Sequence, residues 1–256
     1  MTARVAWIAR TPVKATMFQF VDEANLLEAG VQGDRRFYFI SGSGRLVNNE
    51  DHGPLQLVRA DYDAEADRLS LRFPDGREVD ANVERGDEVE TTFHRTPRKA
   101  RVVVGPWSEA VSELVGEPVL LVEPESPAPD RGRGGAATLL ATASLGRLAE
   151  QLGVDVVDRR RFRMNFGVEG IDAHEEDGWR GRRVQIGDAV IIPQGHVGRC
   201  VITKQNPDTG CIDLDTLKGL AAYRGAAETT EPLPFGIHAA VAETGRVRVG
   251  DPIQLV

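Results

Sequence analysis

The residue pair with the clearest chemical potential in this sequence is a cysteine that directly follows an arginine. Cys200 comes after Arg199 in a β-rich stretch, and a turn signal at residues 207–210 follows it. A thiolate beside a fixed positive charge can act as a nucleophile or as a ligand for a soft metal. Free cysteines also serve as small buried apolar side chains. From the residues alone, all three interpretations of Cys200 stay open.

The other residues that ligate metals or titrate form no recognised site pattern. Cys211 has Ile212 beside it and no basic neighbour, so we interpret it as structural. The five histidines lack HxH or HExxH spacing, which gives no support to a histidine-built metal site. A Cys–His catalytic pair stays open because its members need not be close in sequence. The three adjacent carboxylates at 175–177 can supply an acid or base, but they are more typical of a solvated turn.

Basic and hydroxyl residues indicate where an anion could bind. Arginines cluster at 159–163 and 180–183 in a chain with a formal charge of −8. They form either a solvated face or a pocket for an anionic small molecule. Thr142 and Ser144 precede an expected helix, whose first N–H groups can hold a phosphate, although capping is the plainer explanation. The glycine-rich segment 131–135 lacks the ending of a P-loop and is weak evidence for phosphate binding.

Length and composition indicate an ordinary globular protein. The chain has 256 residues, 41% hydrophobic and 27% charged, which suffices for one large or two small domains. It has no apolar run near the roughly 20 residues of a membrane span, and its first residues lack the apolar core of a secretion signal. Two cysteines without a CxxC motif argue against a disulfide scaffold, and the acidic charge argues against nucleic acid. We expect a cytoplasmic protein with no membrane or nucleic-acid partner.

The elements that must position these residues are expected to be mostly strands. Short β-prone runs lie at 5–8, 37–40 and 55–62. Apolar alternation over 69–73, followed by Pro-Asp-Gly, predicts a hairpin. Gly86-Asp87, between two valines, predicts another tight reversal. Several short strands at this spacing favour barrel-like sheets.

A few helices interrupt the strands. They are expected at residues 107–115, 144–151 and 215–223. Pro106 and Gly116 flank the first, while Ser144 is expected to cap the second and Gly153 to end it. The segment 123–136, rich in proline and glycine, is interpreted as a linker or exposed loop.

A series of short motifs then runs through the chain in a fixed order. In the second half these are Phe-Arg-Met-Asn (162–165), Glu-Asp-Gly-Trp (176–179), Ile-Gly-Asp (186–188), Arg-Cys-Val-Ile-Thr (199–203), Asn-Pro-Asp-Thr-Gly (206–210), Phe-Gly (235–236) and Gly-Asp (250–251). In the first half they are Pro-Val-Lys (12–14), Gly-Asp-Arg-Arg (33–36) and Pro-Trp (106–107), and Ala-Ser-Leu (143–145) precedes the second helix. In number and order they resemble the MOSC domains of molybdenum-cofactor sulfurase and the mitochondrial amidoxime-reducing component.

The resemblance covers nearly the whole chain and implies both a fold and a cofactor. It implies a mainly β, α+β fold, with an N-terminal β-barrel-like domain at 1–122, a loop at 123–136 and a MOSC β-barrel domain at 137–256. It also implies a molybdenum cofactor, held by its pterin dithiolene and one protein cysteine. Cys200 stands at the position of that cysteine. Pyridoxal phosphate is not expected.

The same resemblance implies further cofactor-binding residues. Lys14, Arg35 and Arg163 match positions that contact the cofactor, and an anionic phosphate needs such charged donors. Neutral hydrogen bonds would come from Asn165 and from Thr142-Ala143-Ser144. Arg199 would help to keep the Cys200 sulfur deprotonated.

Some positions depart from the family pattern. Ala15 replaces a serine, Met164 replaces a proline, and Lys204 and Asn206 alter the stretch after Cys200. Residues 48–51 (Asn-Asn-Glu-Asp) replace a more basic family stretch. These departures bear on the substrate more than on the metal.

Three functions follow as hypotheses. The first is a molybdenum oxidoreductase that reduces N-hydroxylated or N-oxide-type small molecules by oxygen-atom transfer, with electrons from a separate donor protein. The second is a sulfur carrier or sulfurtransferase that uses a Cys200 persulfide. The third is a non-catalytic module that binds the molybdenum cofactor.

Overall fold

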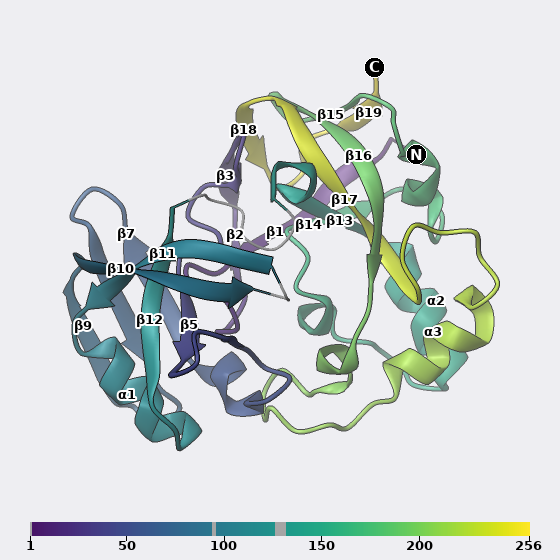
Figure 1. Cartoon of the computed structure of the whole chain (residues 1–256). Helices are drawn as coiled ribbons and strands as arrows, with labels where there is room; N and C mark the ends of the chain where they lie inside the picture. Colours follow the sequence, from purple (N-terminus) through teal and green to yellow (C-terminus); the bar gives the residue numbers. More distant parts are fainter. Residues whose placement is uncertain (1, 94–95, 126–131) are drawn as a thin grey trace.

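The computed structural model describes residues 2–93, 96–125 and 132–256. These residues form a mainly β structure with three α-helices and five short 3₁₀ helices, so the predicted α+β fold class is confirmed. The strands make four sheets, which gather into two parts that lie side by side (Figure 1).

The largest sheet has eight strands, drawn from both ends of the chain. Its order is β19-β15-β16-β17-β13-β14-β1-β2, and its only parallel neighbours among the described strands are β13 and β14. The strands are β1 (Arg4–Arg10), β2 (Gln19–Val21), β13 (Ala137–Ala141), β14 (Phe166–Glu169), β15 (Val184–Ile186), β16 (Ala189–Gly198), β17 (Pro234–Glu243) and β19 (Ile253–Leu255). A three-stranded sheet, β18-β3-β4, again joins the two ends through β3 (Glu23–Leu27), β4 (Gly30–Val31) and β18 (Gly245–Arg248).

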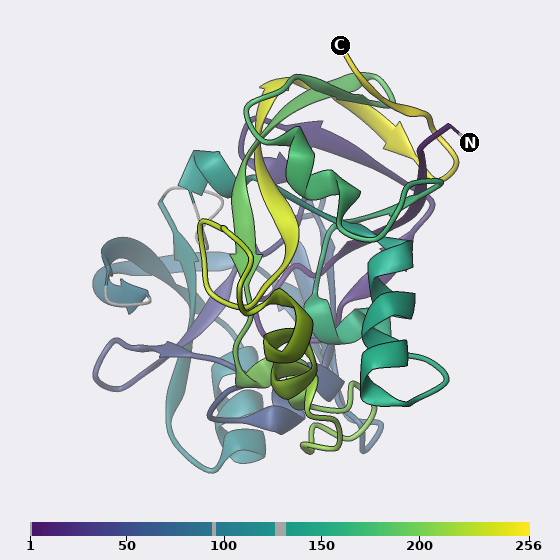
Figure 2. The same ribbon diagram turned by 90° about the vertical axis from the view of Figure 1, so that its right-hand side faces the viewer.

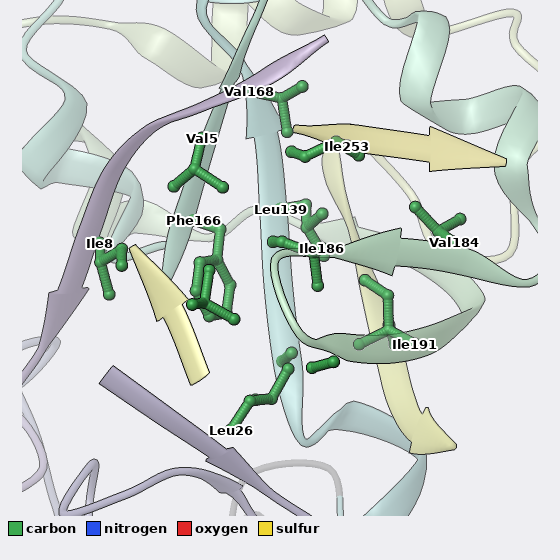
Figure 3. Close-up of a cluster of buried hydrophobic side chains, with 14 of the residues drawn as sticks. Val5, Ile8, Leu26, Leu139, Phe166, Val168, Val184, Ile186, Ile191 and Ile253 are labelled. Carbon is green, nitrogen blue, oxygen red and sulfur yellow. The ribbon is translucent and has the colours of Figure 1, made fainter. Parts of the chain in front are cut away.

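These two sheets share one apolar core. Val5 and Ile8 of β1 are fully buried in the same cluster as Phe166 and Val168 of β14, and Leu26 of β3 joins them (Figure 3). Such burial of branched and aromatic side chains is the main stabilising contribution of the core. The first strand of the chain is therefore a core element of the part that contains Cys200.

The remaining sheets and one helix enclose a second core. A five-stranded sheet, β10-β11-β12-β5-β6, lies beside a three-stranded sheet, β7-β8-β9. The strands are β5 (Tyr38–Ser41), β6 (Leu46–Val47), β7 (Arg59–Asp63), β8 (Arg68–Arg72), β9 (Glu78–Asn82), β10 (Glu84–Phe93), β11 (Thr96–Val104) and β12 (Val119–Pro124). Helix α1 (Trp107–Val115) covers this core, and its fully buried Trp107 donates a hydrogen bond from Nε1 to the Leu69 oxygen at 3.1 Å.

The other two helices pack together beside the eight-stranded sheet (Figure 2). Helix α2 (Thr142–Leu152) ends at Gly153 as predicted, and α3 (Thr216–Arg224) begins after Asp215, which accepts a hydrogen bond from the Lys218 N–H. Gly219 lies where the two helices meet. A Cβ there would be 2.8 Å from Cδ2 of Leu152, so the glycine permits the close approach.

Some sequence-based expectations were wrong. Gly86-Asp87 makes no reversal, because β10 runs through it and bulges against β11. The run at 55–62 begins as a 3₁₀ helix, η1 (Gly53–Leu57), before β7. The N-cap of α2 is Ala141, and Ser144 lies inside the helix. Residues 126–131 of the expected linker lie outside the described residues, and η2 (Gly132–Gly135) follows them.

Candidate functional site

A cavity of about 370 Å³ collects most of the residues that the sequence marked for chemistry. Its wall combines segments that are far apart in the chain: 14–15, 35 and 48–50 from the first half, and 135, 138, 161–164, 197–200 and 202–203 from the second. Five basic side chains line it together with the thiol of Cys200. These are Lys14, Arg35, Arg161, Arg163 and Arg199.

Cys200 is presented by the end of a strand. Strand β16 stops at Gly198, whose N–H donates to Oε2 of Glu231 at 2.8 Å, and the 3₁₀ helix η5 (Val201–Lys204) begins directly after Cys200. Thr203 fixes this turn, because its Oγ1 donates to the Cys200 oxygen at 3.0 Å. Cys200 is exposed, so its interpretation as a buried core residue was wrong. Cys211 is exposed as well, and it does not line the cavity.

Arg35 and Arg163 form a preordered cationic pair. Arg35 donates from Nη2 to the Arg163 oxygen at 2.9 Å, and Arg163 donates from its own Nη2 to the Thr16 oxygen at 2.9 Å. Both guanidinium groups lie over the ring of Phe18, at 4.9 and 5.0 Å from its centroid. Two arginines held in this way lose little conformational freedom when they bind an anion.

Two further arginines brace the wall of the cavity. Arg199 donates from Nε to the Phe235 oxygen at 3.0 Å and from Nη1 to the Phe162 oxygen at 2.9 Å. Arg161 donates from Nη1 to the Gln205 oxygen at 2.7 Å and pairs with Asp213 at 2.7 Å. This ion pair and the hydrogen bond from Asn206 lower the pKa of Asp213.

The basic clusters seen in the sequence divide between the cavity and the surface. In η3 (Arg159–Phe162), Arg159 stacks over the rings of Trp7 and Phe20, and Arg160 pairs with Asp158 and Asp208. Neither residue lines the cavity. Arg180, Arg182 and Arg183 are exposed, which agrees with the solvated-face interpretation for that cluster.

Three predicted site residues lie outside the cavity wall. Asn165 is buried and supports the wall from behind, because its Nδ2 donates to Asp34, the ion-pair partner of Arg35, at 2.9 Å. Thr142 borders a separate surface depression near Val156. Ser144 is buried, and its Oγ accepts a hydrogen bond from the His174 N–H at 2.9 Å.

A buried polar cluster, which the sequence did not predict, lies around η4 (Glu175–Trp179). Glu176 is fully buried rather than solvated, and burial raises its pKa to about 7. Its Oε1 accepts from the Ala141 N–H at 3.1 Å. Burial also lowers the pKa of His174 to about 4. Asp177 pairs with Arg224 and lies 3.7 Å from Nε2 of the buried His196.

The cavity offers one soft metal donor and several donors for an anionic group. Within the described residues, no three His, Cys, Asp or Glu side chains cluster so that they could hold an ion. Cys200 offers one soft donor, and the arginines around it suit an anionic group such as a phosphate. The residues present therefore fit a molybdenum cofactor, whose dithiolene provides further sulfur ligands and whose tail carries a phosphate.

The family of the chain follows from comparison with known domains. The MOSC N-terminal β-barrel domain matches residues 2–118, and the MOSC domain matches residues 130–254. Together these matches account for nearly the whole chain, which belongs to the MOSC-domain proteins. No helix in the described part of the chain is long and apolar enough to cross a membrane.

Curated relatives share part of the sequence. Mitochondrial amidoxime reducing component 2 of Homo sapiens is 39% identical over 98 residues, which are 36% of this chain and 29% of that protein. Its Rattus norvegicus counterpart is 37% identical over 122 residues, 45% of this chain and 35% of that protein. The chain thus spans about a third of the length of these relatives. Among solved structures, the YUAD protein from Bacillus subtilis matches with 12% identity and a TM-score of 0.48, over 99% of this chain and 94% of that one.

Proposed function

We propose that this protein binds a molybdenum cofactor through Cys200 and reduces N-hydroxylated or N-oxide-type small molecules. The observation that carries the proposal is the exposed Cys200 thiol in a cavity lined by five basic side chains. The curated relatives, which are named for amidoxime reduction, support the same reaction class.

The reaction has a simple balance. The N–O bond of the substrate breaks, two electrons and two protons are consumed, and the oxygen leaves as water. The bound molybdenum group supplies the oxygen-accepting redox centre. Both electrons come from a separate donor protein, because the sequence contains no dinucleotide-binding or iron–sulfur motif.

The side chains of the protein would bind the cofactor and hold it in position. Lys14, Arg35 and Arg163 would hold the cofactor phosphate with charge-assisted hydrogen bonds. Asn165 would act as a positioning residue, because its bond to Asp34 orients the carboxylate that pairs with Arg35. Thr142 and Ser144 are left out of the proposed site, since neither lines the cavity.

The test is metal and pterin analysis of protein purified from molybdenum-replete cells. Wild type is expected to carry molybdenum and pterin, and Cys200→Ser to lose the metal while its circular dichroism stays unchanged. Cys211→Ser is the matched control, since Cys211 is also exposed but lies outside the cavity wall. Wild type without molybdenum or pterin would overturn the proposal, as would a Cys200→Ser protein with full metal content and activity.

A sulfur carrier is the second candidate, because it uses the same exposed thiol. Cys200 would accept a sulfane sulfur from a donor persulfide, which leaves as a thiol. This alternative predicts a metal-free protein whose cyanide-reactive sulfur disappears in Cys200→Ser. A non-catalytic cofactor module instead predicts bound cofactor but no N-reduction with an artificial electron donor.

We further propose the division into an N-terminal domain at 1–122, a loop at 123–136 and a MOSC domain at 137–256, together with a cytoplasmic location. In this division the first strands of the N-terminal segment complete the sheets of the MOSC domain, since β1 and β2 belong to its eight-stranded sheet and β3 pairs with β18. The two family matches, which end at 118 and begin at 130, support the division.

A further inference from the structure

A single carboxylate stands among the basic side chains of the cavity. Glu50 is the only acidic residue among the described residues that line it, against one lysine and four arginines. Within the described part of the chain, the Glu50 carboxylate has neither an ion-pair partner nor a hydrogen bond. Its backbone N–H, in contrast, donates to Oδ1 of Asn48 at 2.6 Å.

The cavity arginines are turned toward other partners. Arg35 pairs with Asp34, Arg161 pairs with Asp213, and Arg199 donates to backbone carbonyl oxygens. Arg163 donates to the Thr16 oxygen. The remaining basic side chain, Lys14, has its Nζ over the ring of Phe93, at 5.2 Å from the centroid. None of these contacts involves Glu50, so its charge is left to interact with whatever enters the cavity.

The segment that carries Glu50 is held rigidly against the cavity. Asn49 is buried and donates from Nδ2 to the Ala15 oxygen at 2.6 Å. The buried Gln205 donates from Nε2 to the Asn49 oxygen at 2.6 Å. Residues 48–50 are thereby bonded to the chain on both sides, next to Ala15 and just after η5. The backbone that carries the exposed Glu50 side chain is therefore fixed at the cavity wall.

We propose that Glu50 is a specificity-determining residue that makes the site prefer positively charged substrates over neutral ones of the same shape. The inference rests on the proposed function, in which Lys14, Arg35 and Arg163 face the cofactor phosphate and Glu50 is left for the substrate. An exposed ion pair contributes a modest free energy, so the expected preference is about fivefold. Since the pair is exposed, added salt weakens the preference.

The test uses two substrates that differ only in charge. One is a benzamidoxime with a para-trimethylammonium group, and the other is its neutral para-tert-butyl isostere. The ratio of their kcat/KM values is measured with one artificial electron donor in wild type, Glu50→Gln and Asp51→Asn. The charge preference is expected to fall about fivefold in Glu50→Gln and to persist in Asp51→Asn, because Asp51 is exposed beside Glu50 but does not line the cavity.

A binding measurement separates this inference from the proposed function. Calorimetry with the two corresponding benzamides, which cannot be reduced, reports the same charge preference without turnover. If wild type reduces neither amidoxime but binds the cationic benzamide more tightly through Glu50, the proposed function fails and the inference stands. An unchanged selectivity ratio in Glu50→Gln, with both substrates reduced by wild type, would overturn the role of Glu50 alone.

Discussion

Arg199 is adjacent to Cys200 in the sequence, yet its guanidinium group is bonded to the carbonyl oxygens of Phe162 and Phe235. It therefore ties the strand end that carries Cys200 to η3 and to β17. That Arg199 helps to keep the Cys200 sulfur deprotonated stays a prediction. Its carbonyl partners come from distant parts of the chain, so the local sequence could not reveal them. Lys14, Arg35 and Arg163, which the family pattern marked, line one cavity, and their contact with a cofactor stays a prediction.

For Glu176, the expectation of a solvated side chain was wrong. Three carboxylates in a row are typical of a solvated turn, but the middle one is fully buried and accepts from the backbone N–H of the N-cap of α2. The 3₁₀ helix η4 that carries it packs against strands β13, β16 and β17, which come from other parts of the chain. Nothing in residues 175–177 themselves reveals that packing.

The raised pKa of Glu176 makes a pH prediction. Burial raises its pKa from 4.5 to about 7. Between these two pH values the folded protein binds more protons than the unfolded chain, so the free energy of unfolding falls as the pH rises from 4.5 to 7. The unfolding free energy of Glu176→Gln minus that of wild type should therefore be about 2–3 kcal/mol larger at pH 8 than at pH 5. Urea denaturation at both pH values measures the change. The lowered pKa of His174 gives a pH dependence of opposite sign, which is the same in both proteins and cancels when they are compared. If the difference between variant and wild type were equal at pH 5 and pH 8, Glu176 would not be a buried acid with a raised pKa.

At the scale of elements, regular patterns were predicted well and irregular ones were not. The hairpin of β8 and β9 and the helix α1 followed from alternation and from flanking proline and glycine. The predicted reversal at Gly86-Asp87 was wrong because glycine suits both a reversal and a bulge, and the partner strand decides which of them forms. Here β11 pairs with β10 on both sides of the bulge, so the strand continues.

Strand β14 carries a glycine that β1 requires. A Cβ on Gly167 would lie 2.0 Å from Cε3 of Trp7, inside the indole ring, so the ring would have to move. Gly167→Ala is expected to lower the unfolding free energy by about 1–3 kcal/mol, the usual cost of overpacking. Urea denaturation followed by tryptophan fluorescence measures it.

Helix α2 offers the matched control for this substitution. Gly146 has open space at the Cβ position and an ordinary helical conformation, so Gly146→Ala should raise stability by up to about 1 kcal/mol. Equal effects of the two alanines would show that Trp7 does not pack tightly against β14.

At the scale of the whole molecule, the two ends of the chain depend on each other. Strand β1 pairs with β14, β3 pairs with β18, and Val5, Ile8 and Leu26 are fully buried in the core of the second half. The sequence indicated two β-rich halves. It could not reveal that β1 and β3 pair with strands of the second half, because strand pairing over more than 150 residues leaves no local pattern.

The pairing of β1 and β3 with strands of the second half predicts how fragments of the chain behave. A fragment of residues 132–256 would expose the apolar groups that β1 and β3 cover, so it should bind a hydrophobic dye and unfold without cooperativity. A synthetic peptide of residues 1–35, added in trans, should reduce dye binding, whereas a scrambled peptide should not. Cooperative unfolding of the fragment alone, measured by circular dichroism, would contradict this account.

The composite wall of the cavity has an evolutionary consequence. Cys200 belongs to one stretch of the gene, while residues 48–50 belong to another, and the two stretches meet through the bond from Gln205 to the Asn49 backbone oxygen. Because that bond uses a main-chain atom, side chains at 48 and 50 can change without breaking it. Single-codon changes at positions 48 and 50 can thus alter the cavity wall while the segment that carries Cys200 keeps its place.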